Sequence, residues 1–239
     1  YFLCQLNQQQ LSKAMFPIGE LLKPEVRKIA REQNLPTAER KDSQGICFVG
    51  KVDLPTFLQQ QLQPKVGNII EISESFVEKK KQLEISEENY RKLCFPFPFK
   101  PWNGEIIGKH QGAHFYTVGQ RKGLNIGGHK DPLFVLGTDV LRNIIYVGEG
   151  QNHPGLFRRG LFVSVNEMHW IRTDLKMQPG EKRQFDIRIR YRQPLEKGTI
   201  HVKEDGAWFI FDDEQRGITS GQFAAWYSGD ELIGSGVIA

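Results

Sequence analysis

Two hydrophobic patterns divide the chain near residue 66. Before that point, apolar residues recur every three or four positions, which is the spacing of one helix face. Pro24 in a first turn and Asn34 after a last turn are typical start and stop signals. Gly45 interrupts the helical pattern, and 46–49 reads as a short buried strand. The pattern predicts helices over residues 7–16, 23–34 and 53–62.

From residue 66 onward, short apolar runs alternate with glycine turns, which is typical of β-strands. The first runs predict strands over 67–72, 114–124 and within 133–148. The later runs predict six strands at regular spacing, over 161–170, 183–193, 198–203, 207–212, 221–228 and 231–239. Six short strands joined by Gly, Pro and Asp turns favour a closed barrel. We therefore expect an α+β part followed by an all-β part: short helices and a small central antiparallel β domain, then a C-terminal six-stranded β-barrel.

Residues 73–103 interrupt the central strands with a charged helical pattern that ends in the aromatic-proline run "FPFPFKPW". Proline excludes its preceding residue from the helical region, so this run must be extended. We expect 73–103 to be an insertion on the surface of the central sheet. The patterns together predict domains over residues 1–50, 51–150 and 151–239.

Composition narrows the class of protein. The chain has 239 residues, 39% of them hydrophobic and 25% charged, and no apolar run approaches the length of a membrane span. Three widely spaced cysteines, Cys4, Cys47 and Cys94, make neither an even disulfide framework nor a zinc motif, which favours the reducing cytoplasm. The chain begins at Tyr1, inside an apolar segment, and we expect it to be part of a longer protein.

The net charge is +5 over residues 1–148 and −1 over residues 149–239, which gives the total of +4. A basic part suits a polyanion such as nucleic acid, although a solvated lysine-rich surface would have the same composition. In the predicted strand 183–193, Phe185, Ile187, Ile189 and Tyr191 share one face. Arg188, Arg190 and Arg192 share the other, where they would either follow a phosphate backbone or simply cover an exposed strand.

A second basic element is "TVGQRKGLNIGG" at 117–128, where Arg121 and Lys122 flank a tight turn. It lacks the P-loop pattern and is equally typical of a hairpin tip. His110 and His114 have the spacing of a zinc-protease helix, but the glutamate is missing and a glycine lies between them, so we predict no metal site.

Cys47 stands in "KDSQGICFVG" at the start of an apolar run. An unpaired cysteine in such a run is more often a small buried residue than a nucleophile. A reactive thiol needs a lowered pKa and a path to solvent. Lys41 and the preceding glycine permit that chemistry, so the residues by themselves leave both interpretations open.

Several motifs in order, "YFL.QL", "KPEVR.IA", "KDSQGICF", "GQRKGLNIGG", "RYRQ" and "T.GQ", resemble the bacterial tRNA-specific 2-thiouridylases. The resemblance implies an enzyme that adenylates the wobble uridine of certain tRNAs with ATP and then delivers sulfur from a cysteine persulfide. Cys47 matches the persulfide cysteine, which would receive sulfur from a relay protein and leave as a disulfide with a second cysteine.

The resemblance also implies tRNA contacts at Arg190, Tyr191 and Gln222, whereas Arg121 and Lys122 are candidates from charge alone. Residues 1–50 would then be a remnant of the catalytic domain, and 51–150 a tRNA-binding domain.

The family's glycine-serine-rich nucleotide loop and its first catalytic cysteine do not occur in these residues, and neither Cys4 nor Cys94 convincingly replaces the latter. We therefore expect a monomer whose 239 residues alone form no 2-thiouridine. An RNA-binding module without sulfur chemistry and a partner-docking scaffold are the alternatives.

Overall fold

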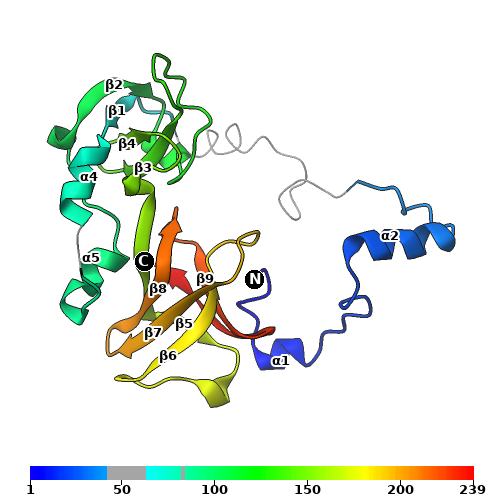
Figure 1. Ribbon diagram of the computed structural model, residues 1–239. Coiled ribbons are helices and arrows are strands. Elements are labelled where there is room, and N and C mark those ends of the chain that lie inside the picture. Colours follow the sequence, from blue (N-terminus) through cyan, green and yellow to red (C-terminus); the bar gives the residue numbers. More distant parts are fainter. Residues whose placement is uncertain (42–62, 82–83) are drawn as a thin grey trace. The chain divides into compact units, whose positions relative to one another are not determined.

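The computed structural model describes residues 1–41, 63–81 and 84–239. The chain forms two compact units, one made of residues 1–7 and 64–239 and the other of residues 8–63. The predicted strand at 46–49, the predicted helix at 53–62 and Cys47 lie outside the described residues. Figure 1 shows the elements of both units in chain order.

The smaller unit contains two described helices, α1 (Gln8–Leu11) and α2 (Lys23–Glu32). Helix α2 agrees with the prediction: Pro24 lies in its first turn and Asn34 takes a left-handed φ of 52° just after its end. The prediction for 7–16 was too long, because α1 is a single turn. None of the α1 side chains is buried, and so short a helix has little stability without tertiary packing.

The central sheet has the strand order β2-β1-β4-β3. Its strands are β1 (Gly67–Glu71), β2 (Glu105–His110), β3 (Leu133–Asp139) and β4 (Ile144–Glu149). The sheet is mixed rather than antiparallel, since β1 and β4 run parallel. No tight hairpin joins these two strands, so nothing in the local chain forces them to be antiparallel.

Both faces of the central sheet are buried. Ile69, Ile145 and Val147 pack beneath the loop that carries Ala113 and Leu124. On the opposite face, the cluster is made of Ile70, Ile72, Val77, Phe99, Leu136, Ile144, Tyr146 and Leu156. The apolar residues of adjacent positions in β1 and β4 therefore face two different cores.

The segment 73–103 is more than a surface insertion. Helix α4 (Glu74–Lys81) and Phe99 cover one face of the central sheet, while α5 (Tyr90–Cys94) packs against the outside of the barrel. Short 3-10 helices complete the structure at Glu87–Asn89, Pro101–Asn103, Ala113–Phe115, Pro154–Leu156 and Thr173–Leu175. The prediction of a surface insertion was wrong because the helical pattern shows which positions of 73–103 are apolar but not which surfaces they cover.

The C-terminal barrel confirms the predicted fold class. Its six strands close in the order β10-β5-β8-β7-β6-β9. They are β5 (Phe157–Trp170), β6 (Lys182–Arg188), β7 (Glu196–Lys203), β8 (Gly206–Arg216), β9 (Phe223–Ser228) and β10 (Glu231–Ile238). Because apolar and polar residues alternate along each strand, one face of the strand points into the barrel interior.

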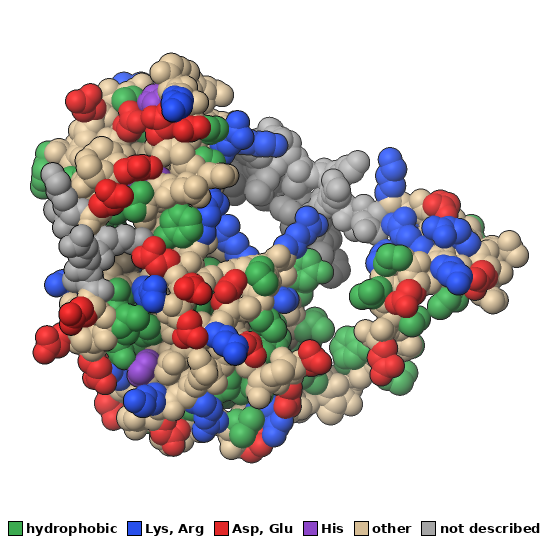
Figure 2. Space-filling view, in the orientation of Figure 1, with side chains coloured by type: hydrophobic (Ala, Val, Ile, Leu, Met, Phe, Trp, Pro, Cys, Tyr) green, Lys and Arg blue, Asp and Glu red, His purple; other side chains and the backbone are tan. Residues whose placement is uncertain are grey.

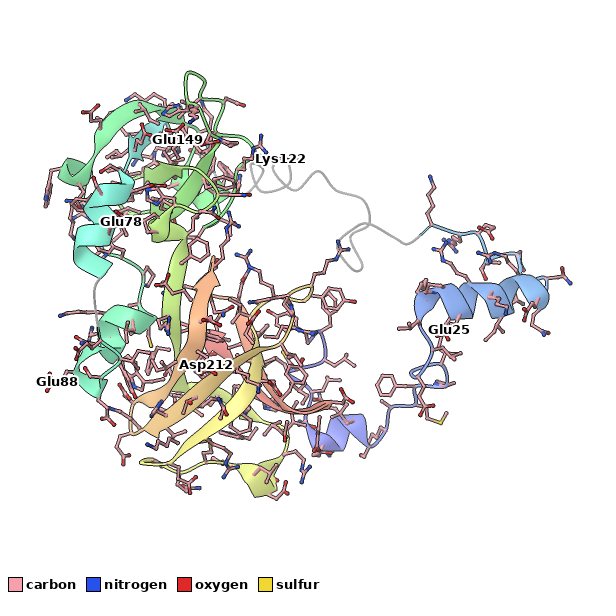
Figure 3. All side chains as sticks on the ribbon, in the orientation of Figure 1. Glu25, Glu78, Glu88, Lys122, Glu149 and Asp212 are labelled. Carbon is pink, nitrogen blue, oxygen red and sulfur yellow. The ribbon has the colours of Figure 1, made fainter. Side chains whose placement is uncertain are left out.

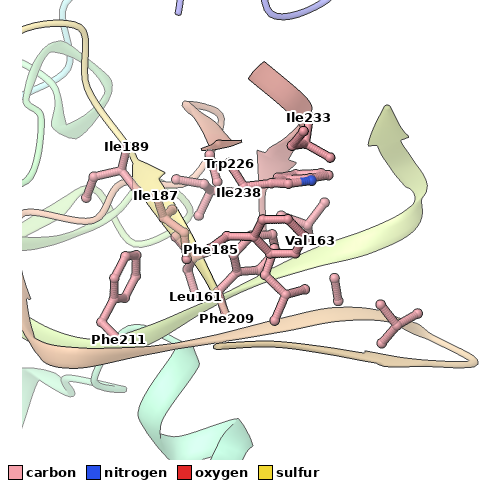
Figure 4. Close-up of a cluster of buried hydrophobic side chains, with 14 of the residues drawn as sticks. Leu161, Val163, Phe185, Ile187, Ile189, Phe209, Phe211, Trp226, Ile233 and Ile238 are labelled. Atoms are coloured by element: carbon pink, nitrogen blue, oxygen red, sulfur yellow. The ribbon is translucent and has the colours of Figure 1, made fainter. Parts of the chain in front are cut away.

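Trp226 is the largest fully buried side chain in the barrel (Figure 4). Its ring lies 5.1 Å from that of Trp170 and 5.5 Å from that of Phe209, measured between centroids. Gly234 is needed beside it, because a Cβ there would lie 2.4 Å from the Trp226 ring. The interior is therefore filled by side chains and leaves the binding surfaces to the outside of the barrel.

Residues 1–7 are fastened to the barrel. The Ser235 hydroxyl donates to the carbonyl of Cys4 at 2.6 Å, and Gln5 Nε2 donates to the Ser235 oxygen at 2.7 Å. The Tyr1 hydroxyl oxygen lies 3.0 Å from both the Ile189 and the Phe223 carbonyl oxygens. These contacts fix the first residues of the chain against strands far away in the sequence.

Candidate nucleic-acid interface

The expected row of three arginines does not form. Strand β6 ends at Arg188 and the residues that follow form a bend and a turn, so only Arg188 of the three arginines lies in the strand. Tyr191, expected on the buried face with Ile189, is instead 52% exposed in the turn. The period-two pattern was extended beyond the point where the ladder hydrogen bonds of β6 stop.

Arg190 is held in place by the barrel. Its Nη2 donates to the Gly217 carbonyl oxygen at 2.5 Å. Gly217 has a φ of +68°, a backbone conformation that favours glycine, and a Cβ at that position would lie 2.8 Å from the same nitrogen. Burial and the neighbouring charge of Arg216 lower the pKa of Arg190, but the guanidinium stays protonated at neutral pH.

Tyr1 joins the segment that follows β6 to the start of β9, next to Arg190 and Gln222. Its hydroxyl contacts the carbonyls of Ile189 and Phe223, which directly precede Arg190 and follow Gln222. The Oε1 atom of Gln222 is buried and has no hydrogen-bond partner in the described part of the chain. Arg190, Tyr191 and Gln222 therefore belong to one region of the barrel surface.

Residues 114–124 do not form the predicted strand. They begin in a 3-10 helix and continue as a loop that the Gln120 side chain holds together, accepting from the Thr117 N–H at 3.1 Å and donating to the Lys122 carbonyl at 2.8 Å. Such local side-chain bonds compete with the ladder bonds of a strand. The backbone of the loop still pairs with β3 at one point, where the Gly119 N–H donates to the Val135 carbonyl and the Val135 N–H donates to the Gln120 carbonyl. Arg121 and Lys122 are exposed on this loop, where Lys122 is labelled in Figure 3.

Arg216 at the end of β8 connects the loop to the barrel, and the sequence reasoning missed it. Its guanidinium carbon lies 5.1 Å from the ring centroid of Phe134 in β3. A Cβ built on Gly119, in the loop, would lie 3.9 Å from Arg216 Nη1. No sequence signal marks this arginine, because its importance arises only from the packing of the barrel end beside the central sheet.

Arg216 shares a groove of about 550 Å³ with Arg190 and Arg192. Carboxylates line the same groove, from Glu196, Asp213 and Glu214. In the part of the chain that the structure describes, none of the salt bridges involves the three arginines. Acidic and basic side chains also alternate on the barrel face in view in Figure 2, so the candidate interface is a local cluster rather than a broad basic patch.

Three family models match successive parts of the chain. The tRNA methyl transferase HUP domain matches residues 1–51, the tRNA methyl transferase PRC-barrel domain 96–149, and the aminomethyltransferase beta-barrel domain 162–238. Proteins named tRNA-specific 2-thiouridylase MnmA match the whole chain: those of Flavobacterium johnsoniae, Christiangramia forsetii and Levilactobacillus brevis are 57%, 54% and 40% identical to it. The chain belongs to the tRNA-specific 2-thiouridylase family.

The chain covers 61%, 61% and 56% of these three relatives, respectively. It therefore spans about three fifths of the length of the 2-thiouridylases it matches. The HUP-domain match at residues 1–51 includes Cys47 and "KDSQGICF". The relatives thus share the region that carries the predicted persulfide cysteine.

The two cysteines that the structure describes are buried. Burial raises the pKa of the Cys94 thiol to about 12, and its sulfur lies 3.8 Å from the Phe209 carbonyl oxygen. Such a thiol is almost entirely protonated at neutral pH and is a poor nucleophile. Neither of the two described cysteines is therefore exposed as a nucleophile.

The glycine-rich loop 117–128 does not fit the triphosphate of ATP. A loop becomes a phosphate cradle when it leads into a helix whose N–H groups point at the anion. Here the loop continues as irregular chain to β3. We therefore derive no nucleotide chemistry from it.

Neither a metal centre nor a membrane-spanning helix is evident in the described residues. No group of three or more His, Cys, Asp or Glu side chains could hold a metal ion. His110, from the pair at 110 and 114, accepts a hydrogen bond from the Gly112 N–H through Nδ1 at 2.9 Å. Across the described helices, none is long and apolar enough to cross a membrane.

Proposed function

We propose that the chain is part of a tRNA 2-thiouridylase that converts the wobble uridine of certain tRNAs to 2-thiouridine. The observation that carries this proposal is the 57% identity over the whole chain to a protein with that name. The cluster of Arg190, Tyr191 and Gln222 on the barrel supports an RNA substrate. The free thiols of Cys4 and Cys94 fit a reducing compartment, and we place the protein in the cytoplasm. We further propose that it acts as a monomer.

The sulfur transfer follows from the chemistry of Cys47. With ATP, the O2 oxygen of the uridine is adenylated and pyrophosphate is released. The terminal sulfur of a Cys47 persulfide, supplied by a relay protein, attacks C2, and AMP leaves as the better leaving group. A second cysteine thiol then attacks Cys47 Sγ, so that a disulfide forms, the sulfur on C2 is reduced to 2-thiouridine, and an external thiol later reduces the disulfide.

The direct test uses the full-length protein with ATP, a tRNA transcript and a persulfide donor. We expect 2-thiouridine in the digested tRNA by liquid chromatography and mass spectrometry. The 239 residues alone should bind the tRNA without forming product. Binding by the full-length protein without any product would instead support an RNA-binding module that lacks sulfur chemistry.

Arg190 and Arg216 are expected to contact phosphates of the tRNA. Arg190→Ala and Arg216→Ala should each weaken binding and reduce the slope of log K against log salt by about 0.9, because each removes one phosphate contact. The measurement is fluorescence anisotropy of labelled tRNA between low and moderate salt. Arg190→Lys retains the charge and should retain most of the slope.

Arg142→Ala is the matched control, since the Arg142 guanidinium is exposed and paired with Asp139 at 2.9 Å. Its slope should equal that of the wild type. Equal slopes for the wild type and both other alanine variants, with melting temperatures unchanged, would show that Arg190 and Arg216 do not contact phosphates.

A further inference from the structure

Phe2 and Tyr191 form an exposed aromatic pair that joins two distant parts of the sequence. Their ring centroids are 4.4 Å apart and the ring planes are tilted by 45°. Phe2 is 76% exposed and Tyr191 52% exposed. Among the described residues, the exposed large aromatic side chains are those of Phe2, Phe16, Trp102 and Tyr191, so two of them in direct contact need an explanation.

The pair is fixed by its neighbours in the chain. The Tyr1 hydroxyl bonds the carbonyls of Ile189 and Phe223, and the Cys4 N–H donates to the Tyr1 carbonyl at 3.1 Å, which turns the backbone at Phe2. On the other side, Ile189 is fully buried and Arg190 is bonded to Gly217. Two anchors on each side hold the rings in one arrangement before any ligand binds, which lowers the entropy cost of binding.

Positive charge surrounds this pair. Arg190 and Arg192 flank Tyr191 in the chain, and the salt bridges of the described residues include neither of them. Exposed aromatic rings beside guanidinium groups are the composition of surfaces that bind single-stranded nucleic acid, where bases stack on the rings and the cations contact the phosphates. A base in a duplex has both faces covered by its neighbours, so only an unpaired base can use such a surface.

We propose that Phe2 and Tyr191 form a stacking platform for an unpaired nucleobase of the tRNA. This inference rests on the proposed function and adds Phe2 to the RNA-binding residues. The platform contributes apolar contact, whereas Arg190 contributes charge. The two contributions therefore respond differently to salt.

The experiment uses full-length protein and anisotropy with labelled tRNA at several salt concentrations. Phe2→Leu and Tyr191→Leu keep an apolar side chain but remove the ring, and each should weaken binding by about 5- to 150-fold with an unchanged salt slope. Phe2→Tyr and Tyr191→Phe keep the rings and should bind within about twofold of the wild type. Trp102→Leu, at a 79% exposed tryptophan of the central domain, is the matched control and should bind like the wild type.

A second probe separates base stacking from phosphate contact. The two leucine variants should lose affinity for a short single-stranded oligouridine but not for a blunt RNA duplex. If both leucine variants bind tRNA with wild-type affinity, the platform proposal is wrong. It is also wrong if their affinities for oligouridine and for the duplex fall by the same factor. A lower melting temperature with unchanged tRNA affinity also overturns it, because the rings would then be covered by protein.

The platform and the proposed function fail in different ways. If the wild-type protein neither binds tRNA nor forms 2-thiouridine, the proposed function is wrong and the platform falls with it. If the wild-type protein does both and the leucine variants bind tRNA as tightly, only the platform is wrong.

Discussion

Replacing Cys47 by serine is expected to abolish 2-thiouridine formation by the full-length protein while leaving tRNA binding intact. A hydroxyl cannot carry a sulfane sulfur, so Cys47→Ser removes the group that is transferred rather than weakening a contact. The loss should reach the background of the assay, measured as 2-thiouridine per tRNA by mass spectrometry. tRNA affinity and melting temperature should stay at the wild-type values.

Cys94→Ala and Cys4→Ala are the matched controls. Both sulfurs are buried, and the Cys94 thiol has its pKa raised to about 12, so neither variant should lose product beyond what reduced stability explains. Persulfide loading followed by mass spectrometry should place a +32 Da adduct, about the mass of one sulfur atom, on Cys47 alone. Full product formation by Cys47→Ser, or an adduct confined to Cys94, would contradict the assignment of Cys47.

Trp226→Ala should destabilise the barrel by about 3–5 kcal/mol, the usual cost of removing a large aromatic side chain from a packed core. Trp226 is fully buried, and its ring packs against Trp170 and Phe209, so truncation leaves a cavity that β-strands cannot easily close. The measurement is the free energy of unfolding in urea, followed by circular dichroism.

Two tryptophan variants separate packing from other effects. In the described residues, the indole N–H of Trp226 has no hydrogen-bond partner, so Trp226→Phe fills much of the space, loses no bond and should cost less than Trp226→Ala. Trp102→Ala, at the exposed tryptophan, should stay within about 0.5 kcal/mol of the wild type. Similar values for Trp226→Ala and Trp102→Ala would mean that Trp226 is not part of the barrel core.

Each difference between expectation and structure can be traced to particular residues. The strand predicted over 114–124 is a loop in which the Gln120 side chain bonds to the backbone on both sides of itself. The arginine row failed because β6 ends at Arg188, which period-two alternation could not show. Arg216 and Phe2 were not predicted as site residues, because each is positioned by a contact with a residue more than eighty positions away in the chain.

The barrel strands, helix α2, the family and the candidate cysteine could all be predicted from the sequence, because alternation, capping residues and contiguous motifs are local features of a chain. Three features became visible only in the fold: the central sheet is mixed, 73–103 covers both the sheet and the barrel, and Tyr1 joins the surroundings of Arg190 and Gln222. These features depend on which distant segments meet. Which distant segments meet is decided by the burial of apolar surface over the whole fold, and it cannot be read from any single stretch of sequence.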